Sequence, residues 1–226
     1  MQAIFETLFD LVYLSTVLVL GITMIREGRG ERQYLLYGIM AVTLGCGDAF
    51  HLVPRAAALC TGGLAAYTAV LGIGKMITSI TMTVFYLLLY GVWRARYRIS
   101  GKRMLTAAVF GLAVVRIVLC LLPNNAWTSA APPLSWGIYR NIPFALLGLL
   151  IVILFFRSAK ETGDRPFRLL WLTVVLSFAC YIPVVLFSET VPAVGALMIP
   201  KTCAYVWTVA IGYRAMKAEL RNSLHE

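Results

Sequence analysis

The chain has 226 residues, of which 60% are hydrophobic and only 13% charged, and its formal net charge is +10 at pH 7. Because soluble domains are usually about 25% charged, this composition excludes an ordinary soluble protein and predicts an all-α, polytopic membrane protein. Nucleic-acid binding is excluded as the reason for the positive charge, since the basic residues are dispersed over short loops without a nucleic-acid-binding motif. The apolar runs are continuous rather than alternating, which also excludes a transmembrane β-barrel.

Seven apolar runs follow one another along the chain, and each is long enough to cross a bilayer. No Lys or Arg precedes the first run and no small-x-small cleavage site follows it, so we expect a retained helix and not a signal peptide. The connections are short, which predicts antiparallel neighbours and a single domain spanning 1–226. The predicted helices are 5–25, 34–52, 66–93, 104–122, 134–156, 167–187 and 192–214.

Basic residues are concentrated in every second connection, and this asymmetry predicts the orientation of the bundle. The connections 26–32, 94–103 and 157–168 and the tail from residue 214 hold 15 of the 20 Lys and Arg residues, whereas the opposite loops hold Arg55. The positive-inside rule then predicts a cell-membrane protein with its N-terminus outside and its C-terminus in the cytoplasm.

The last predicted helix carries a lysine well inside the membrane. Lys201 lies about nine residues from the outer end, which is ~13 Å at a rise of ~1.5 Å per residue. A charge at this depth costs ~2.5–3.5 kcal/mol on insertion scales, so it normally faces protein or water and has a partner. A salt bridge to Asp10 or Asp48 and a role in ligand binding or catalysis are both compatible with the sequence.

Nearly all ionisable groups within the predicted helices fall in the outer half of the membrane, and cations outnumber carboxylates there. The simplest arrangement is one polar pocket that opens toward the outside and is closed at the cytoplasmic end by apolar runs such as 86–90 and 151–156. An anionic ligand would balance the surplus of cations, since Arg and Lys both bind oxyanions. The predicted ligand-binding residues are Lys75, Arg116, Arg140, Lys201, Tyr205 and Asp10, with Asp48 helping to hold the cations in place.

This pattern favours a binding or transport protein for a small anionic solute or a lipid headgroup, acting within the lipid bilayer and without a cofactor. An alternative is an enzyme that acts on a lipid or lipid-linked substrate. Asp48 and His51 lie one helical turn apart and form the best acid–base candidate, with Lys75 or Lys201 stabilising an oxyanion. No metal site is predicted, because zinc usually takes three protein ligands and the only other histidine is His225.

The lysine in the middle of the seventh helix resembles the rhodopsins, and the segments 173–176 (TVVL) and 181–185 (YIPVV) are similar to the sixth helix of microbial rhodopsins. This resemblance implies a second alternative, a retinal-type photoreceptor with its Schiff base on Lys201. The chain departs from that pattern at two positions. Leu197 stands where microbial opsins place a carboxylate one turn before the lysine, and Lys75 stands where their third helix carries a counterion.

Asp48 and His51 also resemble polar residues of the seven-helix membrane hydrolases of the ceramidase and progestin-receptor-like group. That resemblance implies a zinc amidase, but the paired histidines of that group's last helix are absent from this chain.

Overall fold

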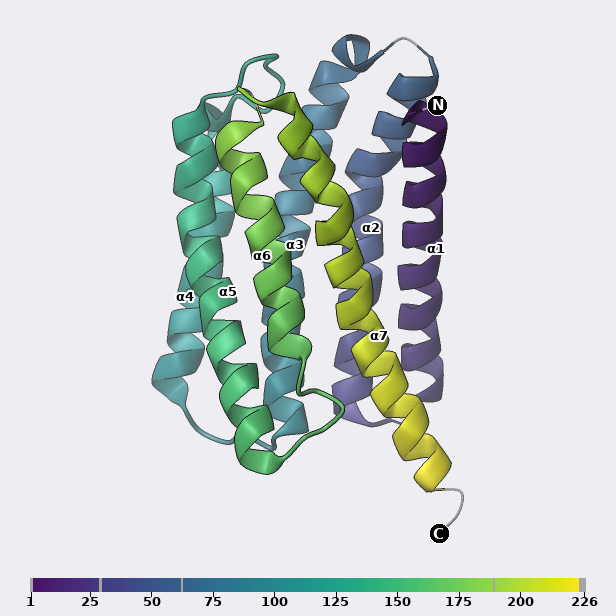
Figure 1. Ribbon diagram of the computed structural model, residues 1–226. Helices are drawn as coiled ribbons and strands as arrows, with labels where there is room; N and C mark the ends of the chain where they lie inside the picture. The colour runs from purple at the N-terminus through teal and green to yellow at the C-terminus, as the bar shows by residue number, and fades with distance from the viewer. Residues whose placement is uncertain (1, 29, 62, 189, 224–226) are drawn as a thin grey trace.

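The computed structural model of the chain describes residues 2–28, 30–61, 63–188 and 190–223, and these form a bundle of long helices (Figure 1). Seven of the described helices are long and apolar enough to cross a membrane, which confirms the all-α class and the prediction of seven long apolar helices. Short 3-10 turns precede or follow some of them. The elements are α1 (Gln2–Glu27), α2 (Arg32–Cys60), η1 (Leu64–Tyr67), α3 (Thr68–Arg96), α4 (Arg103–Leu121), η2 (Pro123–Asn125), α5 (Leu134–Thr162), α6 (Leu170–Phe187), η3 (Pro192–Leu197) and α7 (Met198–Asn222).

Three helices are longer than hydropathy alone predicts. Helix α2 continues through Pro54 to Cys60, α5 continues to Thr162, and α7 continues to Asn222. The residues in these added turns are mostly polar or small. A prediction based on hydropathy therefore leaves them out, although they continue the helix. Helix α6 instead begins late, at Leu170, because the preceding residues form consecutive turns.

Neighbouring helices run antiparallel, so the two chain ends lie at opposite ends of the bundle (Figure 1). We name these the N-terminal end and the C-terminal end. The connections α1–α2, α3–α4 and α5–α6 and the end of α7 all lie at the C-terminal end. The segments with most of the basic residues are therefore gathered at one end of the bundle.

Helices α2 and α3 pack closely because small residues let their backbones approach. A Cβ at Gly47 would lie 2.1 Å from the Thr81 hydroxyl oxygen, and a Cβ at Gly74 would lie 2.4 Å from the Phe50 carbonyl oxygen. The Thr78 hydroxyl donates a hydrogen bond of 3.1 Å to the Gly47 carbonyl. Small residues at helix contacts and hydroxyl bonds across them are typical of membrane bundles.

A polar cluster joins four parts of the chain at the C-terminal end. Arg96 donates to both carboxylate oxygens of Asp164, at 2.9 and 3.0 Å, and also pairs with Glu219 of α7. Gln33 of α2 donates to the second Glu219 oxygen at 3.4 Å. Burial beside Asp164 raises the pKa of Tyr97, so its hydroxyl stays protonated. The cluster ties α2, α3 and α7 to the α5–α6 connection.

Candidate functional site

Lys201 is one of the few charged side chains that the bundle buries. It lies in the first turn of α7 and is 8% exposed. Its ammonium lies over two tyrosine rings, 5.1 Å from the Tyr181 centroid and 5.2 Å from the Tyr205 centroid. Among the described residues no carboxylate oxygen lies within 4.0 Å of it. Lys201 is therefore held by aromatic faces and not by a direct ion pair.

The acidic group that acts electrostatically on Lys201 is Asp48 of α2. The Asp48 carboxylate is partly buried and accepts a hydrogen bond of 2.6 Å from the Tyr13 hydroxyl of α1. This bond orients the carboxylate and links α1, α2 and α7 around the lysine. Asp10 interacts electrostatically with Arg55, Glu6 and Asp48, and among the described residues neither Asp10 nor Asp48 forms the salt bridge to Lys201 that the sequence allowed.

Arg116 of α4 is buried more completely than Lys201, at 2% exposure. Its guanidinium carbon lies 3.2 Å from the centroid of the Phe144 ring of α5. This cation–π contact gives the N–H groups of the guanidinium no acceptor oxygen. Two of these, Nε and Nη1, are buried and have no hydrogen-bond partner among the described residues. A buried charged donor without an acceptor is unfavourable by about 1–3 kcal/mol or more.

Arg116 and Lys201 belong to one group of side chains, which we call the cationic cluster. Arg116 is coupled electrostatically to Lys201, and both lie near Tyr181 and Tyr205. The cluster spans α2, α4, α6 and α7, with Tyr86 of α3 beside it. Its members are Arg116, Lys201, Asp48, Tyr181 and Tyr205. At their ordinary charges two cations face one carboxylate, so the cluster carries one surplus positive charge.

Arg140 is also a predicted ligand-binding residue, but the structure gives it a different set of contacts. Its Nη1 donates to the Asn125 side-chain oxygen at 2.8 Å, and its guanidinium lies 4.2 Å from the Trp127 centroid. Asn125 in turn donates to the carbonyls of Leu119 and Leu122, at 2.6 and 2.8 Å. Arg140 thus ties α5 to the α4–α5 connection, and Asn125 ties that connection to the end of α4. The proline and asparagines in that connection indicate a turn, but not this network.

Lys75 and His51 lie at the N-terminal end of the α2–α3 contact. Lys75 is exposed, in contrast to Lys201, and it acts electrostatically on His51. The His51 Nδ1 atom lies 3.2 Å from the Leu71 carbonyl oxygen, to which its N–H donates. Among the described residues Asp48 and His51 share no hydrogen bond, since Asp48 is bonded to Tyr13. The geometry therefore does not assemble them as an orienter and a base.

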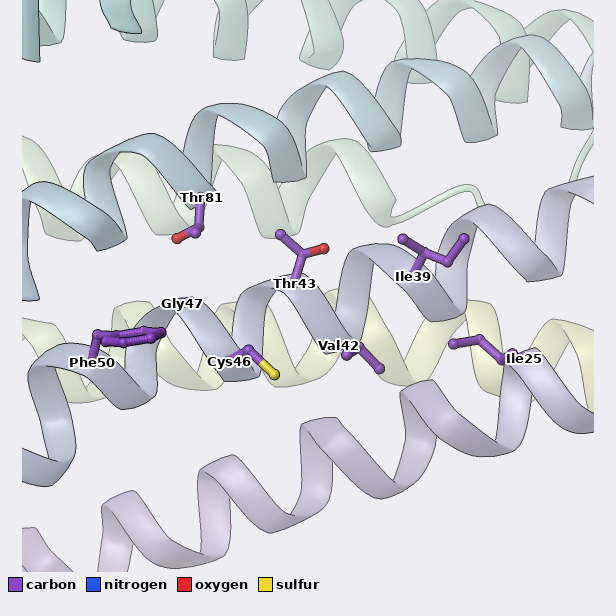
Figure 2. Close-up of a pocket in the computed structure, with 8 residues that line it drawn as sticks. All are labelled: Ile25, Ile39, Val42, Thr43, Cys46, Gly47, Phe50 and Thr81. Carbon is purple, nitrogen blue, oxygen red and sulfur yellow. The ribbon is translucent and has the colours of Figure 1, made fainter. Parts of the chain in front are cut away.

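Two of the grooves on the described part of the bundle surface are almost entirely apolar. The larger, with a volume of about 360 Å³, lies along α2 (Figure 2). In that view Cys46 and Val42 point toward α1, while Thr43 and Thr81 lie between α2 and α3. The second groove, of about 180 Å³, lies between α5 and α6. Neither groove is lined by Lys75 or Lys201.

Sequence reasoning does not identify Phe144, which covers the Arg116 guanidinium. An apolar aromatic residue in an apolar run carries no signal that separates it from a lipid-facing one. Comparisons with protein-family models, curated proteins and solved structures found no match for this chain. The functional argument therefore depends on the geometry of the cluster.

Proposed function

We propose that the chain is an integral membrane binding or transport protein whose anion site is formed by Arg116 and Lys201. One observation carries the proposal. Arg116 is 2% exposed and its Nε and Nη1 atoms have no acceptor among the described residues. Each of these two donors is suited to a charge-assisted hydrogen bond to an oxygen of a carboxylate or another oxyanion.

The charge balance of the cluster supports the same conclusion. Asp48 is held by Tyr13 and can offset only one of the two cations. A buried charge without compensation is strongly unfavourable in a low-dielectric interior. A bound monoanion would remove the surplus and give a free Arg116 donor an acceptor. Tyr181 and Tyr205 keep Lys201 in position for this role through their ring faces.

We further propose that the N-terminus lies outside and the C-terminus in the cytoplasm of a cell membrane. The clustering of the basic connections at the C-terminal end supports this orientation. The cationic cluster would then lie in the outer half of the membrane, because Lys201 is in the first turn of α7 and Arg116 is about one and a half turns before the end of α4.

The test is anion-dependent stabilisation of the purified protein in uncharged nanodiscs. At 100 times the dissociation constant a ligand stabilises by about 2.7 kcal/mol, which for a chain of this size raises the melting temperature by roughly 5–10 °C. Acetate, butanoate, chloride and phosphate are the probes. We expect a rise for at least one anion in the wild type, and no rise in Arg116→Met or Lys201→Met.

Arg103→Met is the matched control, because Arg103 lies on the same helix but is exposed. It should retain the full anion effect. The proposal is wrong if no anion in the series stabilises the wild type, or if the effect persists in both cluster variants.

A second candidate is a retinal-type photoreceptor. The observation in its favour is that Lys201, flanked by Tyr181 and Tyr205, has Asp48 as its acidic neighbour. Asp48 could serve as a counterion from α2 in place of the carboxylates missing at Leu197 and Lys75. Adding retinal to the purified protein should then produce a visible absorbance band that Lys201→Met abolishes. The absence of such a band ends this candidate.

A further inference from the structure

The groove between α5 and α6 combines an apolar lining with a position beside the cationic cluster. Its volume is about 180 Å³, and its rim is formed by aliphatic side chains such as Ile142 and Ile182, which are 52% and 44% exposed. On a membrane-spanning helix such side chains face lipid. The lining residues are Ile138, Asn141, Ile142, Phe144, Ala145, Phe178, Tyr181, Ile182, Val185 and Leu186.

Two of the lining side chains also belong to the surroundings of the buried cations. Phe144 contacts the Arg116 guanidinium, and Tyr181 lies 5.1 Å from the Lys201 ammonium. The two rings meet edge to face, with centroids 6.2 Å apart. A layer of aromatic side chains therefore separates the groove from the unpaired donors of Arg116.

Helices α5 and α6, which form the two sides of the groove, each contain a proline beside it. Pro143 of α5 and Pro183 of α6 each lack an N–H, so each helix loses one backbone hydrogen bond next to the groove. The Tyr181 hydroxyl donates to the Asn141 side-chain oxygen at 3.2 Å and joins the two helices across it. Rotation of Tyr181 and Phe144 would connect the groove to the cluster without breaking an ion pair.

The apolar α5–α6 groove and the neighbouring cationic cluster together favour an amphipathic ligand. The apolar groove suits an aliphatic chain, and an unpaired donor of Arg116 suits a carboxylate oxygen. A monoanion also matches the surplus of one positive charge in the cluster. A phosphate dianion would overcompensate that charge and would lose more hydration on burial.

We propose that the ligand is a single-chain, long-chain carboxylate that enters from the lipid between α5 and α6. Its carboxylate binds Arg116 and Lys201, and its chain occupies the α5–α6 groove. This inference rests on the proposed anion site and adds the class of ligand and its route.

The experiment uses the full chain in phosphatidylcholine nanodiscs with a photoreactive probe, hexadecanoic acid that carries a diazirine on its chain. After illumination, the labelled residues are mapped by mass spectrometry. We expect labels on groove residues of α5 and α6. Unlabelled hexadecanoate should compete with the probe, whereas 1-hexadecanol, which lacks the carboxylate, should not.

Two kinds of variant separate the groove from the anion site. Arg116→Met should reduce groove labelling by about tenfold, the effect of losing charge-assisted hydrogen bonds. Ala145→Trp should fill the groove and reduce labelling to a similar extent, while acetate or butanoate still stabilises the protein. Leu146→Trp is the matched control, because Leu146 is exposed on the same helix outside the groove. It should label like the wild type.

The outcomes distinguish the two proposals. If short anions stabilise the wild type but the groove is not labelled, or if 1-hexadecanol competes as well as hexadecanoate, the fatty-acid inference is overturned and the anion site stands. If neither the stabilisation by short anions nor the labelling by the probe depends on Arg116 and Lys201, both proposals are overturned.

Discussion

Replacing Arg116 by methionine should stabilise the protein in the absence of ligand. Methionine keeps an unbranched apolar stem of similar length and fits irregular gaps in a core. The substitution removes a buried guanidinium whose Nε and Nη1 donors have no acceptor among the described residues. A site evolved to bind an anion is expected to be unfavourable for stability while it is empty.

The magnitude follows from two opposing terms. Two buried donors without acceptors are unfavourable by about 1–3 kcal/mol each, or about 4 kcal/mol together. The substitution also removes the contact with Phe144, and a desolvated cation–π interaction contributes about 2 kcal/mol. The net gain is about 2 kcal/mol, which for a chain of this size is a rise of roughly 4–8 °C in melting temperature.

The assay is thermal unfolding in nanodiscs without added anion, followed by the fluorescence of the five tryptophans. Arg103→Met, at an exposed position, should shift the midpoint by less than about 1–2 °C, since surface substitutions stay within about 0.5 kcal/mol. If Arg116→Met instead lowers the melting temperature by several degrees, Arg116 makes net stabilising contacts. The reasoning from its unpaired donors would then be refuted.

Three further predictions concern the scaffold. Asn125→Ala should destabilise by about 2–4 kcal/mol, because it removes several buried hydrogen bonds at once; chemical or thermal unfolding measures the loss. Arg96→Met should lower the free energy of unfolding by about 2–3 kcal/mol and speed amide exchange at the C-terminal end. Lys217→Met, which breaks an ion pair of two half-exposed side chains, should leave the melting temperature and the exchange rates unchanged. Gly72→Ala should prevent proper packing, because its Cβ would lie 1.6 Å from a carbonyl oxygen of the α4–α5 connection, whereas Gly111→Ala meets nothing within 4 Å and should fold normally. Equal yields of monodisperse protein for both glycine variants would contradict that account.

Sequence alone was sufficient to predict the all-α class and the number of helices long and apolar enough to span a membrane, and it supplied an expected depth for each charge. Hydropathy and run length are local properties, and depth follows from counting residues along a helix of known rise. For this reason the amino-acid sequence is sufficient to predict the seven spans and the burial of the Lys201 side chain, and the fold agrees with both.

Only the tertiary structure decided which side chains meet. Helix packing decides which neighbouring helix a side chain faces. This packing cannot be predicted from the local sequence. Lys75 and Lys201 are at similar predicted depths, yet one is exposed and the other is buried near Asp48. Arg116 and Arg140 look equivalent in the sequence. The α4–α5 connection gives Arg140 an acceptor, whereas the aromatic ring over Arg116 leaves two of its donors unpaired, because packing and not composition determines where the acceptors lie.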